Sequence, residues 1–324
     1  ETYSGGNGGA FYWNADTRNS KLTIDNCKIY DNTAFQAGGG IFCEAIMEIK
    51  GNTEIYNNNS KGYSTHSTYT DWAGGGGIAV STYSNPSITG TMDGGHLVLA
   101  DTIKVYSNHS DSVGGGIFMR VYKSDSLKND ATFSIQLNGA EVYGNPADVS
   151  GGAIYMTRFM DGSYYNTYEG SVLLDYGELK DNAALSGNGG GVYTQNLDVS
   201  IGNTAGKAMI ISGNKAENGA GGAVYATGAG VTCSITNGTI TSNEAANGGA
   251  LACENGAVNV NGGSLESNSA TGDGGAVYVN GSTSTFSITN GTITSNSALN
   301  GGAISCENGT VTANGGSLES NSAT

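Results

Sequence analysis

Two short motifs alternate along the whole chain of 324 residues, and this alternation constrains the fold more than any other feature. The first motif is a glycine pair, then Gly or Ala, then an apolar residue, and it recurs at intervals of 26 to 39 residues. The second motif, aliphatic-x-x-Asn, follows each copy of the first. Repetition at this length indicates a solenoid, in which each repeat packs only on its neighbours. The apolar residues of the first motif are Phe11, Ile41, Ile78, Ile117, Ile154, Val192, Val224, Leu251, Val277 and Ile304.

Each repeat contains three stretches that suit short β-strands. Between the two motifs lies a third apolar alternation, as in Leu22-Thr23-Ile24. Such a unit cannot bury its apolar face alone, so the repeats must stack with identical positions above one another. The chain has 54 Gly, two Pro and 13% charged residues, and no long stretch has the 3.6-residue period of a helix. We therefore predict an all-β chain, a right-handed parallel β-helix (solenoid) with three strands per rung and about ten rungs.

The repeat also predicts which positions face the interior. In the strand after a glycine pair, Val277 and Val279 should point inward, whereas Ala276 and Tyr278 should point outward. The asparagine of the second motif should lie buried in a turn, where its amide can donate to one neighbouring rung and accept from the other. The glycine pair should supply the positive φ or the close approach that a tight corner requires. The predicted structural asparagine ladder consists of Asn32, Asn58, Asn108, Asn145, Asn182, Asn214, Asn243, Asn268, Asn296 and Asn321.

The organisation of the chain changes along its length. We expect residues 1–324 to be a single β-helix segment of a longer chain. Residues 1–191 carry rungs decorated with loop insertions, and residues 192–324 are smooth, minimal repeats. Within the smooth part, the sequence of residues 234–243 returns at 287–296, which is a 53-residue duplication of two turns.

Charge and apolar content exclude several classes of partner. The net charge is −15 and only 13 residues are Lys or Arg, so the dense basic surface needed for nucleic acid is missing. No apolar run approaches the roughly 20 residues of a membrane-spanning helix, and we expect no membrane insertion by this segment. No pair of cysteines forms a CxxC motif, so buried free thiols are expected. The cysteines are Cys27, Cys43, Cys233, Cys253 and Cys306.

Aromatic residues in the inserted loops are the candidate ligand-binding residues. Loops longer than about 12 residues are more often functional than incidental, and Tyr and Trp bind proteins or stack on sugar rings. The alternative is that these side chains pack the loops onto the solenoid. The candidates are Tyr63, Tyr69, Trp72, Tyr83, Tyr122, Tyr164, Tyr165 and Tyr168.

A second aromatic series occupies the outward position of the strand after the glycine pair. Neighbouring members should stand roughly 4.8 Å apart, the spacing between strands. Packing across the strands is the expected role, and a glycan-binding stripe is the alternative. The series is Tyr12, Phe42, Phe118, Tyr155, Tyr193, Tyr225 and Tyr278.

Signals for catalysis or metal binding are weak. The best cluster for a polysaccharide-degrading enzyme is Arg120 and Arg158 near Asp125 and Asp161, but we expect these residues to form a solvated surface patch. We assign no catalytic residue and no cofactor. The three histidines share no metal or triad spacing, and a calcium ion is a weak option. The histidines are His66, His96 and His109, and the carboxylates considered for calcium are Asp93, Asp101, Asp111 and Asp161.

The alternating motifs resemble the Gly-Gly-Ala-aliphatic and Phe-x-x-Asn repeats of the chlamydial polymorphic outer-membrane proteins and their bacterial relatives. The resemblance covers nearly all of the chain and implies a pectin-lyase-like parallel β-helix in a secreted or surface-displayed passenger with an adhesive role. The second motif departs from the family, because it carries an aliphatic residue such as Ile29 or Val105 where the family has Phe. This departure favours the wider bacterial class over the chlamydial group.

Three functional hypotheses follow. The leading one is an extracellular, cell-surface adhesin-like or stalk segment of a large bacterial repeat protein. Its N-terminal loops would bind a host surface protein or glycan. The first alternative is a polysaccharide lyase or hydrolase built on a β-helix. The second is a purely structural spacer or filament protomer, in which copies of the chain associate end to end.

Overall fold

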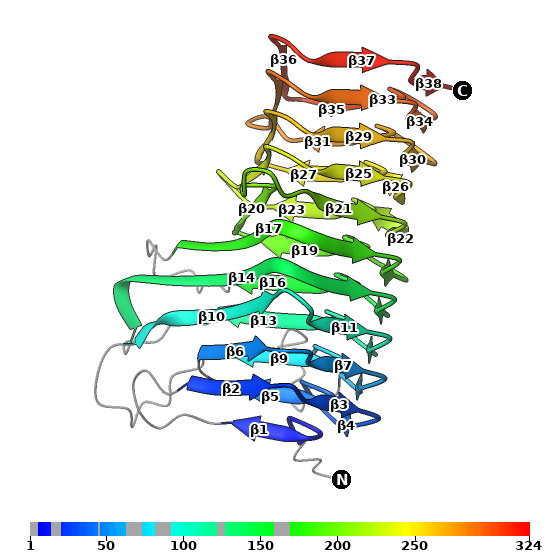
Figure 1. Ribbon diagram of the computed structural model, residues 1–324. Coiled ribbons are helices and arrows are strands. Elements are labelled where there is room, and N and C mark those ends of the chain that lie inside the picture. Colours follow the sequence, from blue (N-terminus) through cyan, green and yellow to red (C-terminus); the bar gives the residue numbers. More distant parts are fainter. Residues whose placement is uncertain are drawn as a thin grey trace.

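The chain folds as a right-handed parallel β-helix (Figure 1). The computed structural model describes residues 6–13, 21–44, 46–62, 73–81, 92–121, 127–158 and 169–324. These residues form strands β1 to β38 and no helix, and every strand pairing among them is parallel. The predicted fold class is confirmed.

Sheet A contains the strand that follows each glycine pair. Its parallel register places the apolar residues of successive first motifs in one column, as in Ile117 opposite Ile154. Its strands, in stacking order, are β1 (Phe11–Trp13), β5 (Ile41–Cys43), β9 (Ile78–Ser81), β13 (Ile117–Val121), β16 (Ile154–Arg158), β19 (Val192–Gln195), β23 (Val224–Thr227), β27 (Leu251–Glu254), β31 (Val277–Asn280) and β35 (Ile304–Glu307).

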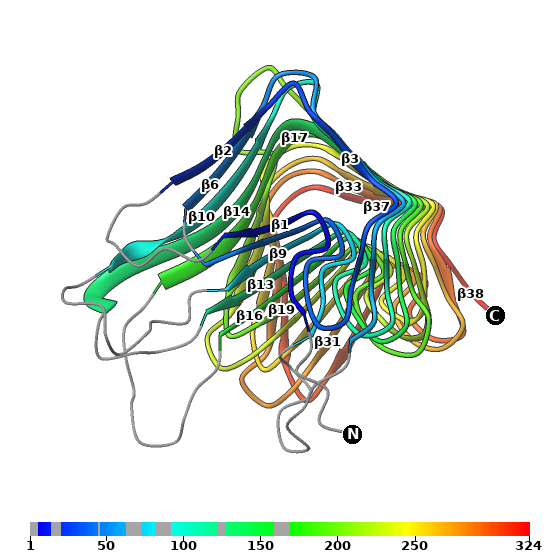
Figure 2. The same ribbon diagram turned by 90° about the horizontal axis from the view of Figure 1, so that it is seen from below.

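Sheet B contains the other two predicted strands of each rung, and Figure 2 shows that it bends between them. In two rungs a single long strand, β14 or β17, crosses the bend. The strands are β2 (Lys21–Asp25), β3 (Lys28–Tyr30), β6 (Ile46–Lys50), β7 (Glu54–Tyr56), β10 (Met92–Ala100), β11 (Lys104–Tyr106), β14 (Leu127–Tyr143), β17 (Glu169–Lys180), β20 (Asp198–Ile201), β21 (Met209–Ser212), β24 (Thr232–Ile235), β25 (Thr239–Thr241), β28 (Ala257–Val260), β29 (Ser264–Glu266), β32 (Thr285–Ile288), β33 (Thr292–Thr294), β36 (Thr310–Ala313) and β37 (Ser317–Glu319).

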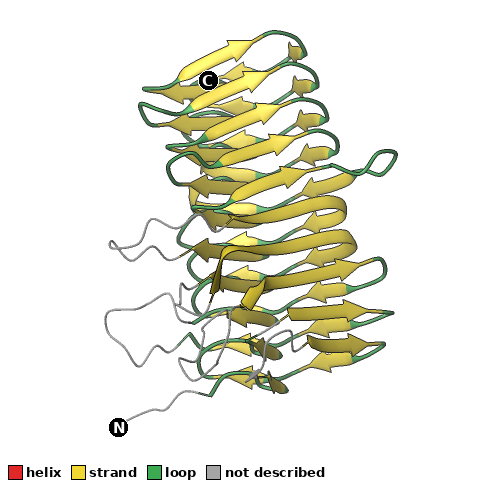
Figure 3. Ribbon diagram, turned by 90° about the vertical axis from the view of Figure 1, so that its left-hand side faces the viewer, coloured by secondary structure: helices red, strands yellow, loops and turns green. Residues whose placement is uncertain are grey.

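Sheet C follows each ladder asparagine and was not predicted, because most of its strands are only two residues long and carry no apolar alternation. Figure 3 shows the rungs stacked along one axis. The strands of sheet C are β4 (Thr33–Ala34), β8 (Asn59–Ser60), β12 (His109–Ser110), β15 (Pro146–Ala147), β18 (Ala183–Ala184), β22 (Lys215–Ala220), β26 (Glu244–Asn247), β30 (Ser269–Ala270), β34 (Ser297–Ala298) and β38 (Ser322–Ala323).

One continuous apolar core runs through the stack. Val277 and Val279 are fully buried in it, as predicted. Ala276 was expected to point outward but belongs to the same core. The five cysteines have free thiols, and burial raises the pKa of Cys253 to about 12, so this thiol stays protonated.

The ten ladder asparagines are joined side chain to side chain. From Asn32 to Asn296, each Nδ2 donates to Oδ1 of the asparagine in the next rung, at 2.9 to 3.1 Å. The same Oδ1 also accepts the backbone N–H of the donating residue; Asn145 Oδ1 accepts from Asn108 N at 3.0 Å. The second Nδ2 proton reaches a carbonyl of the preceding rung, as in Asn145 to Val105 at 3.0 Å. Each interior amide thus links three rungs. The polar groups around it in the turn have hydrogen-bond partners within the protein.

The two glycines of the first motif have different roles. In the glycine pair of the fifth rung, Gly151 has a φ of 66°, a left-handed conformation that residues with a Cβ adopt at a cost. Gly152 has an ordinary φ, but a Cβ on it would lie 2.2 Å from the Gly190 carbonyl oxygen and 2.5 Å from the Ala183 nitrogen. The first glycine therefore makes the turn, and the second lets sheet A approach the backbone of the next rung.

Replacing an interior ladder asparagine should destabilise the solenoid strongly. Asn145→Ala would leave the Asn108 amide and the Val105 carbonyl buried without this partner. Each such group costs about 1 to 3 kcal/mol, so we expect a loss of about 3 kcal/mol or more. Urea unfolding followed by circular dichroism measures it, with the exposed Asn52→Ala as the control. Equal unfolding midpoints for both variants would contradict the ladder's role.

The second glycine should tolerate no side chain, whereas the third position of the motif should. Gly152→Ala forces a Cβ onto backbone atoms of the next rung, and we expect a cost of about 1 to 3 kcal/mol or more. Gly116→Ala is the matched, milder change: its Cβ would lie 2.8 Å from the Ala153 carbonyl oxygen, and the equivalent position of the next rung is already occupied by Ala153. Thermal unfolding should separate the two variants, and similar Tm values would show that close approach is not the constraint.

Candidate ligand-binding site

The eight aromatic residues predicted to bind ligand lie outside the described residues, and their role stays a prediction. They are Tyr63, Tyr69, Trp72, Tyr83, Tyr122, Tyr164, Tyr165 and Tyr168. What the structure describes is the scaffold around them, including the strands that precede and follow each inserted segment.

A hollow of about 590 Å³ lies where the rungs change width. On one side are the long strands β14 and β17, with 17 and 12 residues, and on the other is β20 with four. Figure 1 shows β14 and β17 extending beyond the strands of the later rungs. The lining residues come from β10, β14, β17, β20, the end of β16 and the turns after β19 and β23. They are His96, Thr132, Phe133, Ser134, Gln136, Arg158, Gly170, Ser171, Leu173, Asn196, Leu197, Asp198, Ser200, Ala229, Gly230 and Val231.

Strand stacking arranges the polar lining in two columns. One column runs through three sheet B strands as Ser134, Ser171 and Asp198, and the parallel register places these residues opposite one another. The second column is offset by two residues along each strand, which keeps it on the same face. It consists of Gln136, Leu173 and Ser200. The alternate residues of these strands point into the core.

His96 extends the first column to β10. Its Nδ1 lies 2.9 Å from Ser134 Oγ, which also accepts a hydrogen bond from Gln136 Nε2 at 2.9 Å. Burial lowers the pKa of His96 from its ordinary 6.5. The imidazole is therefore neutral at pH 7, and its unprotonated nitrogen can accept the Ser134 hydroxyl proton.

Arg158 and Asp198 bring opposite charges to the hollow. Burial lowers the pKa of Arg158, and the Asp198 carboxylate acts in the other direction, so the guanidinium remains charged. Asp198 Oδ1 also accepts the Thr232 N–H at 2.7 Å. The site therefore combines hydroxyl and amide groups with one balanced pair of charges.

The predicted arginine cluster is not formed. Arg120 is level with Thr157 and Arg158 is level with Val121, so the two arginines are offset by one residue across the pair of strands. Neighbouring strand positions face opposite sides of a sheet, and the two side chains therefore leave sheet A on opposite faces. Arg120 is also only 3% exposed, which contradicts a solvated patch. Asp125 and Asp161 lie outside the described residues.

The outward aromatic series is largely buried, so packing is its role. The exposed fractions of Phe42, Phe118, Tyr155, Tyr225 and Tyr278 are 2 to 7%. The chain turns back between sheets C and A (Figure 2), and residues of this turn, such as Ala37, Val113 and Ala220, pack beside the rings. Rings covered in this way cannot stack on a sugar, and the series makes no glycan-binding stripe; only Tyr12, in the first described rung, is 54% exposed.

A third aromatic series, which the sequence analysis missed, lies on the outer face of sheet B. Four stacked tyrosines have ring centroids 4.9 Å apart and nearly parallel planes. Tyr106 Oη donates to Glu54 Oε2 at 2.9 Å. The ring faces cover one another, so the series presents mainly edges to solvent. The signal was available, because Tyr follows the aliphatic residue of the second motif in four consecutive rungs: Tyr30, Tyr56, Tyr106 and Tyr143.

The comparisons with known proteins give no relative. No family model matches the chain, and no curated protein or solved structure is significantly similar to it. Among the described residues, none lies in a helix that is long and apolar enough to span a membrane.

The depressed pKa of His96 should make stability depend on pH. Above pH 7 the imidazole is neutral in both the folded and unfolded chain, so it contributes no pH dependence. As the pH falls through 6.5, the unfolded chain takes up a proton that the folded chain resists, and the folded state loses stability. Unfolding midpoints measured from pH 8 to 5 should fall more steeply for the native chain than for His96→Gln. Parallel curves for the two proteins would contradict the burial of this imidazole.

Proposed function

We propose that this chain is a glycan-binding, adhesin-like segment of a large extracellular bacterial surface protein, and that the hollow receives the sugar. One observation carries the proposal. Arg158 and Gly170 both line the hollow, and they flank the segment that contains Tyr164, Tyr165 and Tyr168. The segment that the sequence singles out for binding thus lies, along the chain, between two residues of the hollow.

The lining suits a neutral sugar. Ser134, Gln136 and Ser200 offer hydroxyl and amide groups that donate to and accept from sugar hydroxyls. The partly exposed Leu173 offers apolar surface to the C–H groups of a sugar ring. The charges of Arg158 and Asp198 offset each other, and the volume falls within the range of about 300 to 1,000 Å³ typical of small-molecule sites.

The fold supports binding in a further way. The polar columns are carried by hydrogen-bonded parallel strands, so their spacing is set before a ligand arrives, and less ordering is needed on binding. The resemblance of the repeat motifs to those of the polymorphic outer-membrane proteins implies surface display and adhesion. It supports the same proposal from the sequence side, and a host glycan is the partner that we favour over a host protein.

Filling the hollow should abolish binding. We expect Ser200→Tyr to weaken binding to any glycan found on an array by at least tenfold, because its ring occupies the second polar column. Ser287→Tyr is the matched control, since Ser287 occupies the same column of sheet B three rungs farther along and lies outside the hollow lining.

The Tyr-rich segment needs a separate test. The triple variant with Tyr164, Tyr165 and Tyr168 changed to Ala should also lose glycan and cell binding. If Ser200→Tyr and the triple variant both bind as the native chain does, the hollow is not the site. If no glycan and no cell surface binds the native chain, the spacer hypothesis replaces this one.

A polysaccharide-degrading activity is the second candidate, and one observation favours it. His96, Arg158 and Asp198 line the same hollow, so acid–base groups stand beside the proposed sugar site. Incubation of the native chain with a glycan identified on the array, followed by analysis of the products, separates the two. Release of shorter sugars that Arg158→Ala abolishes would establish the enzyme, whereas unchanged substrate would leave the binding role.

A further inference from the structure

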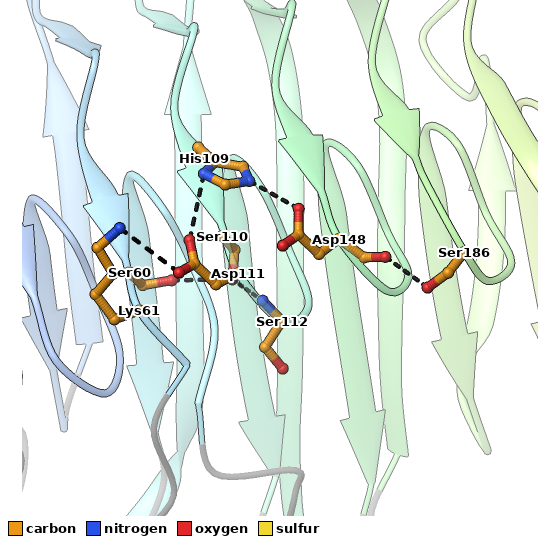
Figure 4. Close-up of polar contacts among 8 residues, drawn as sticks. All are labelled: Ser60, Lys61, His109, Ser110, Asp111, Ser112, Asp148 and Ser186. Atoms are coloured by element: carbon orange, nitrogen blue, oxygen red, sulfur yellow. Dashed lines mark hydrogen bonds and ion pairs between the residues drawn. The ribbon is translucent and has the colours of Figure 1, made fainter.

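Three side chains with metal-ligating atoms converge at sheet C, away from the hollow. They are His109, Asp111 and Asp148, and one ligand atom of each lies within 4.8 Å of the others (Figure 4). His109 directly follows the ladder residue Asn108, and each aspartate stands three residues after a ladder asparagine. Because β12 and β15 pair in parallel, this position is repeated from one rung to the next and the aspartates become neighbours. The stack therefore creates the cluster from residues up to 39 positions apart.

The imidazole of His109 lies between the two carboxylates. Nε2 is 2.9 Å from Asp148 Oδ1, and Nδ1 is 3.4 Å from Asp111 Oδ1. A neutral imidazole carries one N–H and one lone pair, so it can donate to only one of the two carboxylates. The other contact then brings a lone pair toward an anionic oxygen. Asp111 Oδ1 is shielded from solvent and accepts no hydrogen bond from the described residues. That contact becomes favourable when a metal cation is shared between the imidazole and the carboxylate.

We propose that His109, Asp111 and Asp148 form a binding site for a divalent transition-metal ion of the zinc type, which joins the third and fourth rungs. One imidazole nitrogen and two carboxylate oxygens are a ligand set that zinc accepts, and three protein ligands leave a position for water. Calcium, the weak option from the sequence, is disfavoured because it takes six to eight oxygen ligands. Of the carboxylates considered for calcium, Asp111 belongs to this cluster. Asp101 is exposed elsewhere, and the side chain of Asp93 and all of Asp161 are outside the described residues.

The neighbouring residues hold the ligands in place. Ser186 Oγ donates to the Asp148 backbone carbonyl at 2.6 Å and so restrains the chain at that ligand. Ser110, directly before Asp111, accepts a hydrogen bond through its Oγ from Ser60 Oγ at 2.9 Å. The same oxygen accepts from the backbone N–H of Ser112, directly after Asp111, at 3.2 Å. Such contacts orient metal ligands before the ion binds.

Lys61 gives the proposal a distinctive consequence. Its Nζ lies 3.5 Å from Asp111 Oδ2, so its positive charge competes with a metal ion for that carboxylate. Removing this charge should tighten zinc binding. In a purely structural network of ion pairs, the same change would only remove a favourable contact.

Zinc titration of the chain tests the site. The protein is stripped with chelator, and ZnCl₂ is added at pH 7.5 while binding heat and Tm are recorded. We expect binding of one zinc per chain and a rise in Tm. His109→Ala and Asp148→Asn should weaken binding at least tenfold, and Lys61→Met should strengthen it several-fold. Glu244→Gln is the matched control, because Glu244 belongs to sheet C and pairs with Lys215 outside the cluster.

Several outcomes would overturn the proposal. One is the absence of zinc-dependent heat and of any Tm change in the native chain. Another is zinc binding that His109→Ala leaves intact, or that Lys61→Met weakens. A Tm that responds to CaCl₂ but not to ZnCl₂ would reject the transition-metal assignment. A stabilising effect of His109 that is the same with and without zinc would show that the cluster is a network of hydrogen bonds and ion pairs only.

Discussion

The buried asparagine ladder is the interaction on which the rest of the structure depends. A rung must turn sharply after its second motif, and this turn places backbone N–H and C=O groups where water does not reach them. The side chain of one asparagine per rung satisfies an N–H and a C=O group of the rung before, and it donates to the asparagine side chain of the rung after. Because each amide depends on its neighbours, the ladder fixes the register of the entire stack. Sheets A, B and C inherit this register, and so does every column of side chains on the surface.

Columns of side chains are the means by which this fold builds a site. A residue in one rung is placed beside its counterpart in the next, whatever the length of the chain between them. The hollow combines Ser134, Ser171 and Asp198 in this way, and the sheet C cluster combines His109 with Asp148. Both sites lie in or next to the rungs that carry inserted segments. The smooth rungs repeat Ser, Thr and Asn in the outward columns of sheet B, and these uniform columns suit a spacer.

Much of the fold could be predicted from the sequence, whereas the candidate sites could not. Asn145 and Gly152 were assigned roles that the structure confirms, because the same residue type returns at the same point in rung after rung. Arg120 and Arg158 were grouped wrongly, since a shift of one residue in register puts their side chains on opposite faces. The histidines were dismissed for lack of a metal spacing within the sequence. His109 finds its partner 39 residues away through stacking, a distance that depends on the length of the inserted loop.

The sequence by itself determined that the chain is a parallel β-helix, that a column of apolar residues including Val277 and Val279 lines its core, and which asparagines join its rungs. It could do so because every rung of a solenoid folds in the same way. The residues that each rung requires therefore recur along a single chain. The tertiary structure alone decided which residues of different rungs meet, how the turn between sheets C and A covers the outward rings, and where the change in rung width leaves a hollow. These features depend on the register between rungs and on the lengths of the strands. The repeat motifs define register and length only within the motifs themselves.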